Sequence, residues 1–385
     1  MDTVNANLAS VTEKLDRIGT NVEANMESVQ NQLKEQERVN RQLRADIVET
    51  KERLNGITEQ LEQMTHETSQ EEQAEEMKKG IAEPDGVDRE TKVVIAGGAN
   101  PTNLKSVEIF SQSNGIWTPL QPMEDIHSGA SSVVYNNQLF VVGGWTQSIE
   151  KLSLGAVHVD QSIPWENVPA ELPVMLEGHC SVVYNGRLIV IGGLRALSND
   201  FKCLDSILEI SLEVPPSTTE LTTMKQARRF HGVATFGDKI VIFGGAESLA
   251  LKRSELALDC VVMYDISKNE FNELAPLPHP VSAMAIVKWG DENVIIMGGA
   301  DSNDQPLNKV IIYNIKTQKS YELPDMKYKR KGCVAAVVKD TVIVMGGQNE
   351  RGNYLKSVES FKFDRFTWED LPEMNEARSH ATAVA

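Results

Sequence analysis

The sequence predicts two parts, a long α-helical coiled coil followed by an all-β domain built from repeated four-stranded units. Two observations support this prediction. Up to about Met64, apolar residues recur in steps of three and four, which is the period of a helix. From Lys92 onward, a strand ending in Gly-Gly returns six times at nearly even spacing, which indicates a repeat architecture.

Residues 1–65 are predicted to form a coiled-coil oligomerisation helix. Fifteen of the eighteen seam positions between Val4 and Met64 are apolar, and such a narrow stripe over many heptads is typical of a coiled coil. Asn40 falls at an a position, where a polar residue favours two parallel strands. We therefore expect a homodimer, while a trimer, a hetero-partner and antiparallel pairing stay open.

An acidic flexible linker is expected over residues 66–90, where the apolar seam ends. Glutamates gather around Glu71 and Glu75, and Gly80 and Pro84 follow, which is linker composition. Of the net charge of −17, a share of −10 belongs to residues 1–90, which hold 11 Lys and Arg against 21 Asp and Glu. Most of the negative charge therefore precedes the repeats.

Composition narrows the function classes. An acidic chain without clustered Lys and Arg lacks the charge pattern of a nucleic-acid binder. No apolar run reaches the roughly 18 residues of a membrane helix, and no signal peptide is evident. The four cysteines are far apart and form no CxxC motif, which favours a reducing, cytoplasmic location over a disulfide framework or a zinc site.

Each repeat is marked by a glycine pair and, in five of the six, by an aromatic residue about twenty positions later, such as Trp117 or Trp368. Alternating apolar strands lie before and after each pair, apart from the first pair, which lacks the earlier strand. Four short antiparallel strands per ~48 residues are the signature of a propeller blade. The structural glycine pairs are Gly97 and Gly98, Gly143 and Gly144, Gly192 and Gly193, Gly244 and Gly245, Gly298 and Gly299, and Gly346 and Gly347.

Residues 91–385 resemble the kelch repeat in the Gly-Gly strand, the Tyr or Phe beside an acidic residue in the third strand, and the Trp in the fourth. The resemblance implies a six-bladed kelch β-propeller, closest in style to the kelch-like substrate receptors. Those receptors carry a BTB domain where this chain has its coil. The third repeat lacks the Trp and the second lacks the usual turn, so we expect blades two and three to be distorted.

The C-terminal strand, residues 379–385, is expected to close the ring. The first repeat begins with its Gly-Gly strand and lacks the strand that precedes this element in the other five repeats. The final residues "SHATAVA" have the composition of that missing strand. Pairing the last strand with the first blade would leave no open seam, and the kelch family closes its ring in this way.

The resemblance also implies a ligand-binding face. Kelch-like receptors bind peptides through the residues just before the first strand of a blade and those just after Gly-Gly. Carried over by position, these residues are His127, Ser128, Glu177, Arg228, Arg229, Ser282, Arg330, Lys331, Arg378 and Ser379 in the first set and Asn100, Trp145, Arg195, Glu247, Asp301 and Gln348 in the second.

Five cations in the first set suggest an acidic or phosphorylated peptide ligand, because Arg binds carboxylates bidentately. The alternative is that these side chains pair with acidic neighbours such as Asp325 and Glu376 and hold the loops in place. Trp145 is the strongest single candidate, because an exposed aromatic residue at a cleft is a frequent interface anchor.

We therefore expect a non-catalytic protein-interaction scaffold that captures a peptide or protein and is multimerised by its coil. Two alternatives are a substrate-recognition subunit of a ubiquitin ligase and an actin-crosslinking protein. We expect no enzyme activity, cofactor or metal, because the histidines are scattered through the chain. The Glu-x3-Asp-x3-His pattern of the plant specifier branch is also absent.

Overall fold

A computed structural model divides the chain into two units, Met1–Glu75 and Glu76–Ala385. The predicted coiled coil (residues 1–65) and linker (66–90) lie outside the described residues, apart from six single positions that are helical and exposed. The structure describes residues 92–157, 160–197, 200–248 and 255–385 together with Lys14, Arg17, Gly19, Thr20, Met26 and Lys34.

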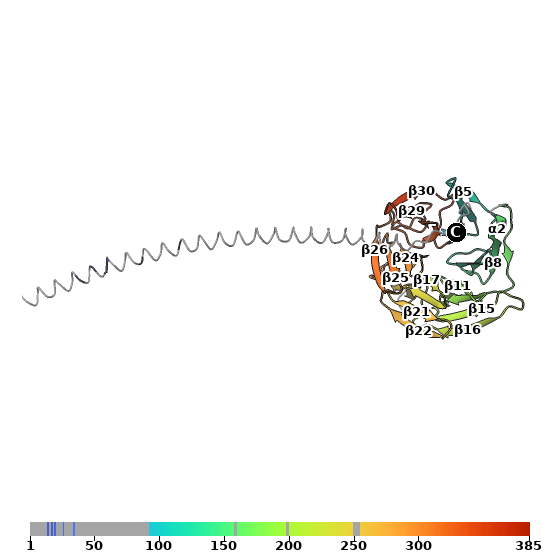
Figure 1. The fold of residues 1–385 in the computed structure, drawn as a ribbon, viewed down its shortest axis with the longest axis horizontal. Coiled ribbons are helices and arrows are strands. Elements are labelled where there is room, and N and C mark those ends of the chain that lie inside the picture. Colours follow the sequence, from blue (N-terminus) through green and yellow to red (C-terminus); the bar gives the residue numbers. More distant parts are fainter. Residues whose placement is uncertain are drawn as a thin grey trace, which may run out of the picture. The chain divides into compact units, whose positions relative to one another are not determined.

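The described part of the second unit forms six four-stranded antiparallel sheets, arranged as the blades of a ring (Figure 1). Residues of the innermost strands line a cavity at the centre of this ring, which we call the channel. The first strands of neighbouring blades lie side by side around this channel. From the channel outwards, the first blade is β31 (Thr382–Val384), β1 (Lys92–Ala96), β4 (Val107–Ser111) and β5 (Ile116–Pro119), and the second is β6 (Ser131–Tyr135), β7 (Gln138–Val142), β8 (Ile149–Ser153) and β9 (Glu166–Asn167). The third blade is β11 (Cys180–Tyr184), β12 (Arg187–Ile191), β15 (Ser206–Ile210) and β16 (Thr218–Thr223), and the fourth is β17 (Gly232–Phe236), β18 (Lys239–Phe243), β21 (Val261–Asp265) and β22 (Glu270–Leu274). The fifth blade is β23 (Ala285–Trp289), β24 (Asn293–Met297), β25 (Val310–Asn314) and β26 (Lys319–Leu323), and the sixth is β27 (Val334–Val338), β28 (Thr341–Met345), β29 (Val358–Lys362) and β30 (Thr367–Leu371).

The second strand of each blade forms the centre of the hydrophobic core. These strands are the apolar runs that precede Gly-Gly, and nearly all of their residues are buried, as in β28. A continuous apolar run is expected where both faces of a strand are covered. Here each blade packs between two neighbours, so neither face of the second strand meets water.

Each glycine pair joins its blade to the next one. Gly97 and Gly98 have φ values of 65° and 97°, and the Gly98 N–H donates to the carbonyl of His127 in the second blade at 2.7 Å. A Cβ at Gly97 would lie 2.1 Å from the same oxygen, so no larger residue fits. The same bond recurs at 2.8–2.9 Å from Gly144 to Leu176, Gly193 to Arg228, Gly245 to Val281, Gly299 to Arg330 and Gly347 to Arg378.

Three tryptophans at or beside the fourth strand tie the first, second and sixth blades to the preceding blade. Their rings are buried, and each indole N–H reaches a carbonyl in the loop that leaves the neighbouring blade. These bonds run from Trp117 to Pro372 at 2.9 Å, from Trp165 to Gln121 at 3.1 Å and from Trp368 to Pro324 at 2.7 Å. In these three blades the aromatic that marks the repeat in sequence is therefore an inter-blade contact.

The C-terminal strand completes the first blade. Residues 382–384 pair antiparallel with β1, with Thr382 opposite Ala96, and Ser379 forms a bridge to Ala99. The regular strand is thus shorter than the expected 379–385. The residues before it approach the first blade through the loop that follows Gly-Gly.

Blades two and three are irregular, as their sequences predict. In the second blade a short helix, α2 (Leu154–Val157), follows β8, and the outer strand β9 has only two residues. In the third blade the pairing of β15 with β16 shifts register between Ile207 and Leu208. The outer edge of these two blades therefore differs from that of the other four.

Candidate functional site

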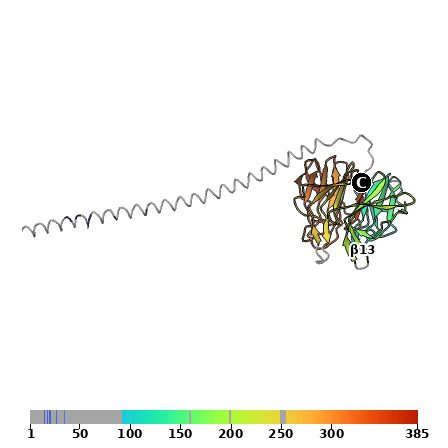
Figure 2. The same cartoon turned by 90° about the horizontal axis from the view of Figure 1, so that it is seen from below.

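One end of the ring carries the loops that sequence analysis connects with binding. The loops that follow the Gly-Gly pairs lie there, together with the loops that enter the first strands, and we call this end the hairpin face. Figure 2 shows β13 at this end of the ring. The small strands of the face are β2 (Ala99–Asn100), β3 (Thr102–Asn103), β10 (Leu176–Glu177), β13 (Leu194–Leu197), β14 (Asp200–Cys203), β19 (Ala246–Ser248) and β20 (Glu255–Ala257).

A closed ring of backbone hydrogen bonds surrounds the channel mouth at this face. Each blade contributes one residue with φ between 50° and 66°, whose N–H donates to the carbonyl of the equivalent residue in the preceding blade. The bonds run from Gly178 to Gly129 at 2.7 Å, Phe230 to Gly178 at 2.7 Å, Ala283 to Phe230 at 2.8 Å, Gly332 to Ala283 at 2.8 Å, His380 to Gly332 at 2.7 Å and Gly129 to His380 at 2.8 Å.

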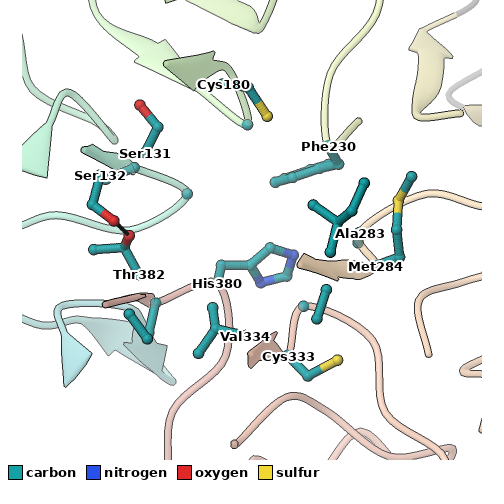
Figure 3. A pocket seen from close by; sticks show the side chains of 18 of the residues that line it. Ser131, Ser132, Cys180, Phe230, Ala283, Met284, Cys333, Val334, His380 and Thr382 are labelled. Atoms are coloured by element: carbon teal, nitrogen blue, oxygen red, sulfur yellow. Dashed lines mark hydrogen bonds between the residues drawn. The ribbon is translucent and has the colours of Figure 1, made fainter. Parts of the chain in front are cut away.

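Two side chains from this ring meet over the channel. Phe230 and His380 point toward one another (Figure 3), with ring centroids 4.8 Å apart. Burial, and then the charges of Arg229 and Lys331, lower the pKa of His380 to about 4, so its imidazole is neutral at neutral pH. The pair lines a cavity of about 240 Å³ whose walls are the first strands of the blades.

The structure corrects the expectation of a cationic rim. Arg228, Arg330 and Arg378 are only 2%, 0% and 1% exposed, so they do not present a charge to a ligand. Arg330 pairs with Glu359 at 2.6 Å, and Arg378 pairs with Glu108 at 2.8 Å and more distantly with Glu376. The predicted alternative, internal pairing that fixes the loops, describes these two arginines.

His127 occupies the same position in the second blade and is also buried. Its Nε2 lies 2.9 Å from Glu150 and its Nδ1 lies 2.6 Å from the Gly143 carbonyl oxygen. Burial alone would raise the pKa of the Glu150 carboxyl, but hydrogen bonds from His127 and from two backbone amides outweigh this effect and lower it. Three further candidates, Ser128, Ser282 and Ser379, are buried too, and the buried side chains do not form a binding surface.

The remaining two cations are partly exposed but already paired. Arg229 contacts Glu177 at 3.0 Å and lies over the Phe230 ring. Lys331 contacts Asp304 at 2.6 Å. Desolvation raises the pKa of Glu177 against the opposing effects of Arg229 and of a hydrogen bond from Trp145, so this carboxylate is held near the face at an energetic cost.

The clearest contact surface is an aromatic pair over blades two and three. Trp145, which follows Gly143 and Gly144 directly and has a φ of 62°, packs edge-on against Phe201 of β14 with centroids 6.5 Å apart. Phe201 is 51% exposed. Trp145 belongs to the predicted set, whereas Phe201 does not, because it lies eight residues beyond its glycine pair and the prediction took only the residues just after Gly-Gly.

Two other candidates from the second set are partly exposed at the same face. Arg195 lies in β13, opposite Leu176 of β10, and Gln348 forms a bridge to Lys331. Within the described ranges, no three His, Cys or carboxylate side chains gather in a way that could hold a metal ion. No helix among the described residues is long and apolar enough to cross a membrane.

Two protein-family models match the repeats of this chain. Residues 129–330 match the KLHDC2/KLHL20/DRC7 Kelch-repeats domain, and residues 329–375 match the Kelch motif. The chain belongs to the kelch-repeat family. Its glycine-pair joints, buried tryptophans and ring closure are thus features of a kelch propeller.

The chain matches part of each of several relatives. The chain is 34% identical over 117 residues to Kelch repeat and BTB domain-containing protein 2 of Cowpox virus, covering 30% of this chain and 20% of the relative. It is 28% identical over 170 residues to Kelch-like protein 41a of Danio rerio, covering 44% and 27%. Alpha-scruin of Limulus polyphemus is 28% identical over 146 residues, covering 36% and 15%. The chain thus spans about a quarter or less of these relatives.

A solved structure supports the fold. The structure of YjhT superposes with a TM-score of 0.59 at 14% sequence identity, covering 69% of this chain and 89% of that one. At this identity the likeness concerns the fold, an all-β propeller.

Proposed function

We propose that this kelch protein is a non-catalytic interaction scaffold that captures a protein or peptide on its hairpin face, with Trp145 and Phe201 as anchors. The observation that carries this proposal is the half-exposed Phe201 ring packed on Trp145. Aromatic anchors at the centre of an interface supply much of its binding energy. Trp145 stands on the loop after its glycine pair and Phe201 in the neighbouring β13–β14 hairpin, at the loop end of a closed scaffold where binding residues concentrate.

The burial of the arginines changes the expected ligand. Arg228, Arg330 and Arg378 are withdrawn from the surface, and Arg229 and Lys331 face carboxylates. An acidic or phosphorylated peptide would have to displace those carboxylates. We therefore propose a ligand that places an aromatic or aliphatic side chain against Phe201, beside the Glu177–Arg229 pair.

Multimerisation by the N-terminal coil completes the proposed scaffold. Two linked propellers would bind a target with two copies of the ligand motif more tightly, by ~10²-fold or more where the geometry permits. Light scattering of the full chain and of residues 91–385 measures the oligomeric state of each. We expect a dimer for the full chain alone, and a monomeric full chain would contradict the proposal.

The face is tested by panning a peptide library on the immobilised full chain. We expect enriched sequences with a shared apolar residue, whose binding falls at least ~10-fold in Phe201→Ser because the aromatic ring that the ligand would cover is lost. Ile116→Ser is the matched control, because Ile116 is 57% exposed on the outer strand β5. Equal binding by both variants would reject this face, and acidic consensus peptides would reject the apolar anchor.

Phe201→Ser and Ile116→Ser also distinguish a ubiquitin-ligase function from a cytoskeletal one. In affinity purification from cells, cullin components or actin that bind the wild type and Ile116→Ser but not Phe201→Ser would assign a ubiquitin-ligase or a cytoskeletal function. Recovery of the same partners by all three proteins would place the partner site elsewhere on the chain.

A further inference from the structure

Three blades bury a glutamate beneath the loop that enters them. The glutamate lies in the third strand, opposite the residue two places before Gly-Gly. It is Glu108 in the first blade, Glu150 in the second and Glu359 in the sixth, at 3%, 0% and 0% exposed. Each carboxylate contacts a basic side chain of the entering loop, which is Arg378, His127 or Arg330, respectively.

Both oxygens of these carboxylates accept hydrogen bonds. Oε1 of Glu108 accepts from Arg378 at 2.8 Å and from the backbone N–H of Glu376 at 3.1 Å. Its Oε2 accepts from the backbone N–H of Asn375 at 2.9 Å. The glutamates of the second and sixth blades likewise lie against a basic side chain and accept from the loop backbone. Basic side chain and loop together thus hold a carboxylate by both oxygens.

The fourth blade keeps the arginine without the glutamate. Arg228 corresponds in the entering loop to Arg378 and Arg330, and Val262 occupies the position of the glutamate. In the third and fifth blades both positions are apolar, with Leu176 and Leu208 in one and Val281 and Ile311 in the other. Among the described residues, the fourth blade alone therefore combines the buried cation with an apolar residue in the third strand.

Arg228 has fewer partners than its equivalents. One guanidinium nitrogen donates to the Gly244 carbonyl at 2.9 Å and the other to the Cys260 sulfur at 3.2 Å, whereas Arg330 donates four hydrogen bonds. Within the described ranges, no carboxylate pairs with this guanidinium, which is only 2% exposed. An arginine stays charged in a protein, and a buried cation without a counter-charge is unfavourable.

The loop before Arg228 carries the other donors of a carboxylate site. Lys225 and Gln226 correspond to Asn375 and Glu376 of the first blade. Their backbone N–H groups donate to no acceptor in the part of the chain that the structure describes. The fourth blade therefore has the cation and the loop amides that hold a carboxylate elsewhere in the ring.

The residues around Arg228 leave access for a small anion. Val262 and Cys260 are partly exposed, whereas the three glutamates are buried. We propose that the fourth blade binds a small free carboxylate anion where three other blades have a glutamate side chain. One oxygen accepts from Arg228 and the N–H of Gln226, and the other accepts from the N–H of Lys225. The buried guanidinium thereby gains a charge-assisted partner.

Two carboxylates beside the loop favour an anion with a single charge. Glu247 accepts from the Gln226 side-chain amide at 2.9 Å, and Glu273 accepts from Lys225 Nζ at 2.6 Å. Neither is bonded to Arg228, and both repel a second negative charge. Formate, which is a carboxylate group without a side chain, is therefore the probe.

Amide hydrogen exchange of the full-length protein, followed by mass spectrometry, tests the site. Sodium formate replaces sodium chloride at constant ionic strength, so that general salt effects cancel. Formate at about 100 mM should slow exchange in residues 224–228 by about threefold or more, because it binds their N–H groups. Residues 374–378 of the first blade should not change, because Glu108 holds that position. Equal exchange in both salts would contradict the proposal.

Val262→Glu supplies the carboxylate from within the chain. Formate should then have no effect on the exchange of residues 224–228, because the glutamate occupies the position. Formate should also raise the Tm of the wild type by about 2 °C or more and leave the Tm of Val262→Glu unchanged.

Two further variants separate the buried cation from surface charge. Arg228→Met should lose the response to formate. Lys225→Met removes an 81% exposed ammonium group, keeps the backbone N–H and should retain the response. Val262→Glu decides the question if Arg228→Met does not fold, and exchange of the wild type decides it if neither folds. The proposal is wrong if a folded Val262→Glu protein responds as the wild type does, or if Lys225→Met loses the response.

Discussion

Buried charges hold the loops that enter the blades. In the second blade, the Glu150 carboxylate accepts hydrogen bonds from the backbone amides of Glu124 and Asp125, each at 2.8 Å, and lies 2.9 Å from the His127 ring nitrogen. It therefore fixes a whole turn as well as one side chain. Removing one member of such a buried network leaves the other groups without partners, which is more costly than losing a surface ion pair.

Glu150→Gln tests this at the residue scale. We expect a loss of about 3 kcal/mol at neutral pH. The pKa of Glu150 is lowered in the folded protein, so its stabilisation is present above the unfolded pKa and is lost as pH falls through the folded pKa. The difference from wild type should shrink in acid, as followed by Tm across a pH series. Glu166→Gln, which changes an exposed ion pair, should have little effect, and equal losses would contradict the network.

The pKa of Glu177 is shifted in the opposite direction from that of Glu150. Desolvation raises its pKa despite Arg229 and Trp145, so the ionised carboxylate costs stability at neutral pH. Glu177→Gln should raise the free energy of unfolding by about 0.5 kcal/mol or more, and the gain should disappear as pH falls from the folded pKa toward the unfolded pKa. Urea unfolding at neutral and acid pH measures both. A destabilised variant would show instead that the ion pair with Arg229 stabilises the face.

At the element scale, the glycine pair is a joint between blades as well as a turn. Gly244 and Gly237 lie in the same blade with φ values of 51° and 59°. A Cβ at Gly244 would lie 2.5 Å from the Val281 carbonyl oxygen of the next blade, whereas a Cβ at Gly237 meets nothing within 4 Å. The two positions therefore share a positive φ, but only a side chain at Gly244 would collide with the next blade.

Alanine at these two positions separates the cost of a positive φ from the cost of a collision between blades. Gly237→Ala should lose about 1 kcal/mol, the cost of a positive φ for a side-chain-bearing residue. Gly244→Ala should lose about 3 kcal/mol or more, because the blades must also move apart. Denaturant unfolding of both variants gives the comparison. Similar losses would mean that the pair acts through backbone conformation alone.

The elements also show which features of the fold could be predicted from the sequence. The strands and glycine pairs repeat, so their period predicts the blades. The partner of a buried arginine does not follow from the repeat, because Arg378 meets Glu108, 270 residues away, through ring closure. Phe201 was not among the predicted residues, since it lies in the second strand of the β13–β14 hairpin and the prediction took only residues that directly follow Gly-Gly. Sequence therefore predicted the scaffold, and for the arginines it left two environments open, of which the structure shows the internally paired one for Arg330 and Arg378.

At the scale of the whole molecule, two sets of backbone hydrogen bonds encircle the channel. One set runs from the second glycine of each pair to the next blade, and the other links the six residues at the channel mouth. Both pass through the C-terminal segment, at Arg378 and His380. The last residues therefore complete a cooperative ring.

Deletion of residues 376–385 should thus destabilise every blade, although truncation at a terminus is usually tolerated. The variant loses the β31–β1 pairing, the Arg378–Glu108 ion pair, one bond of the glycine set and two bonds of the channel-mouth set. We expect Tm to fall by about 10 °C or more. The synthetic peptide EARSHATAVA should restore Tm in a concentration-dependent way, whereas a scrambled peptide should not. An unchanged Tm after deletion would mean that the ring is stable without its closing strand.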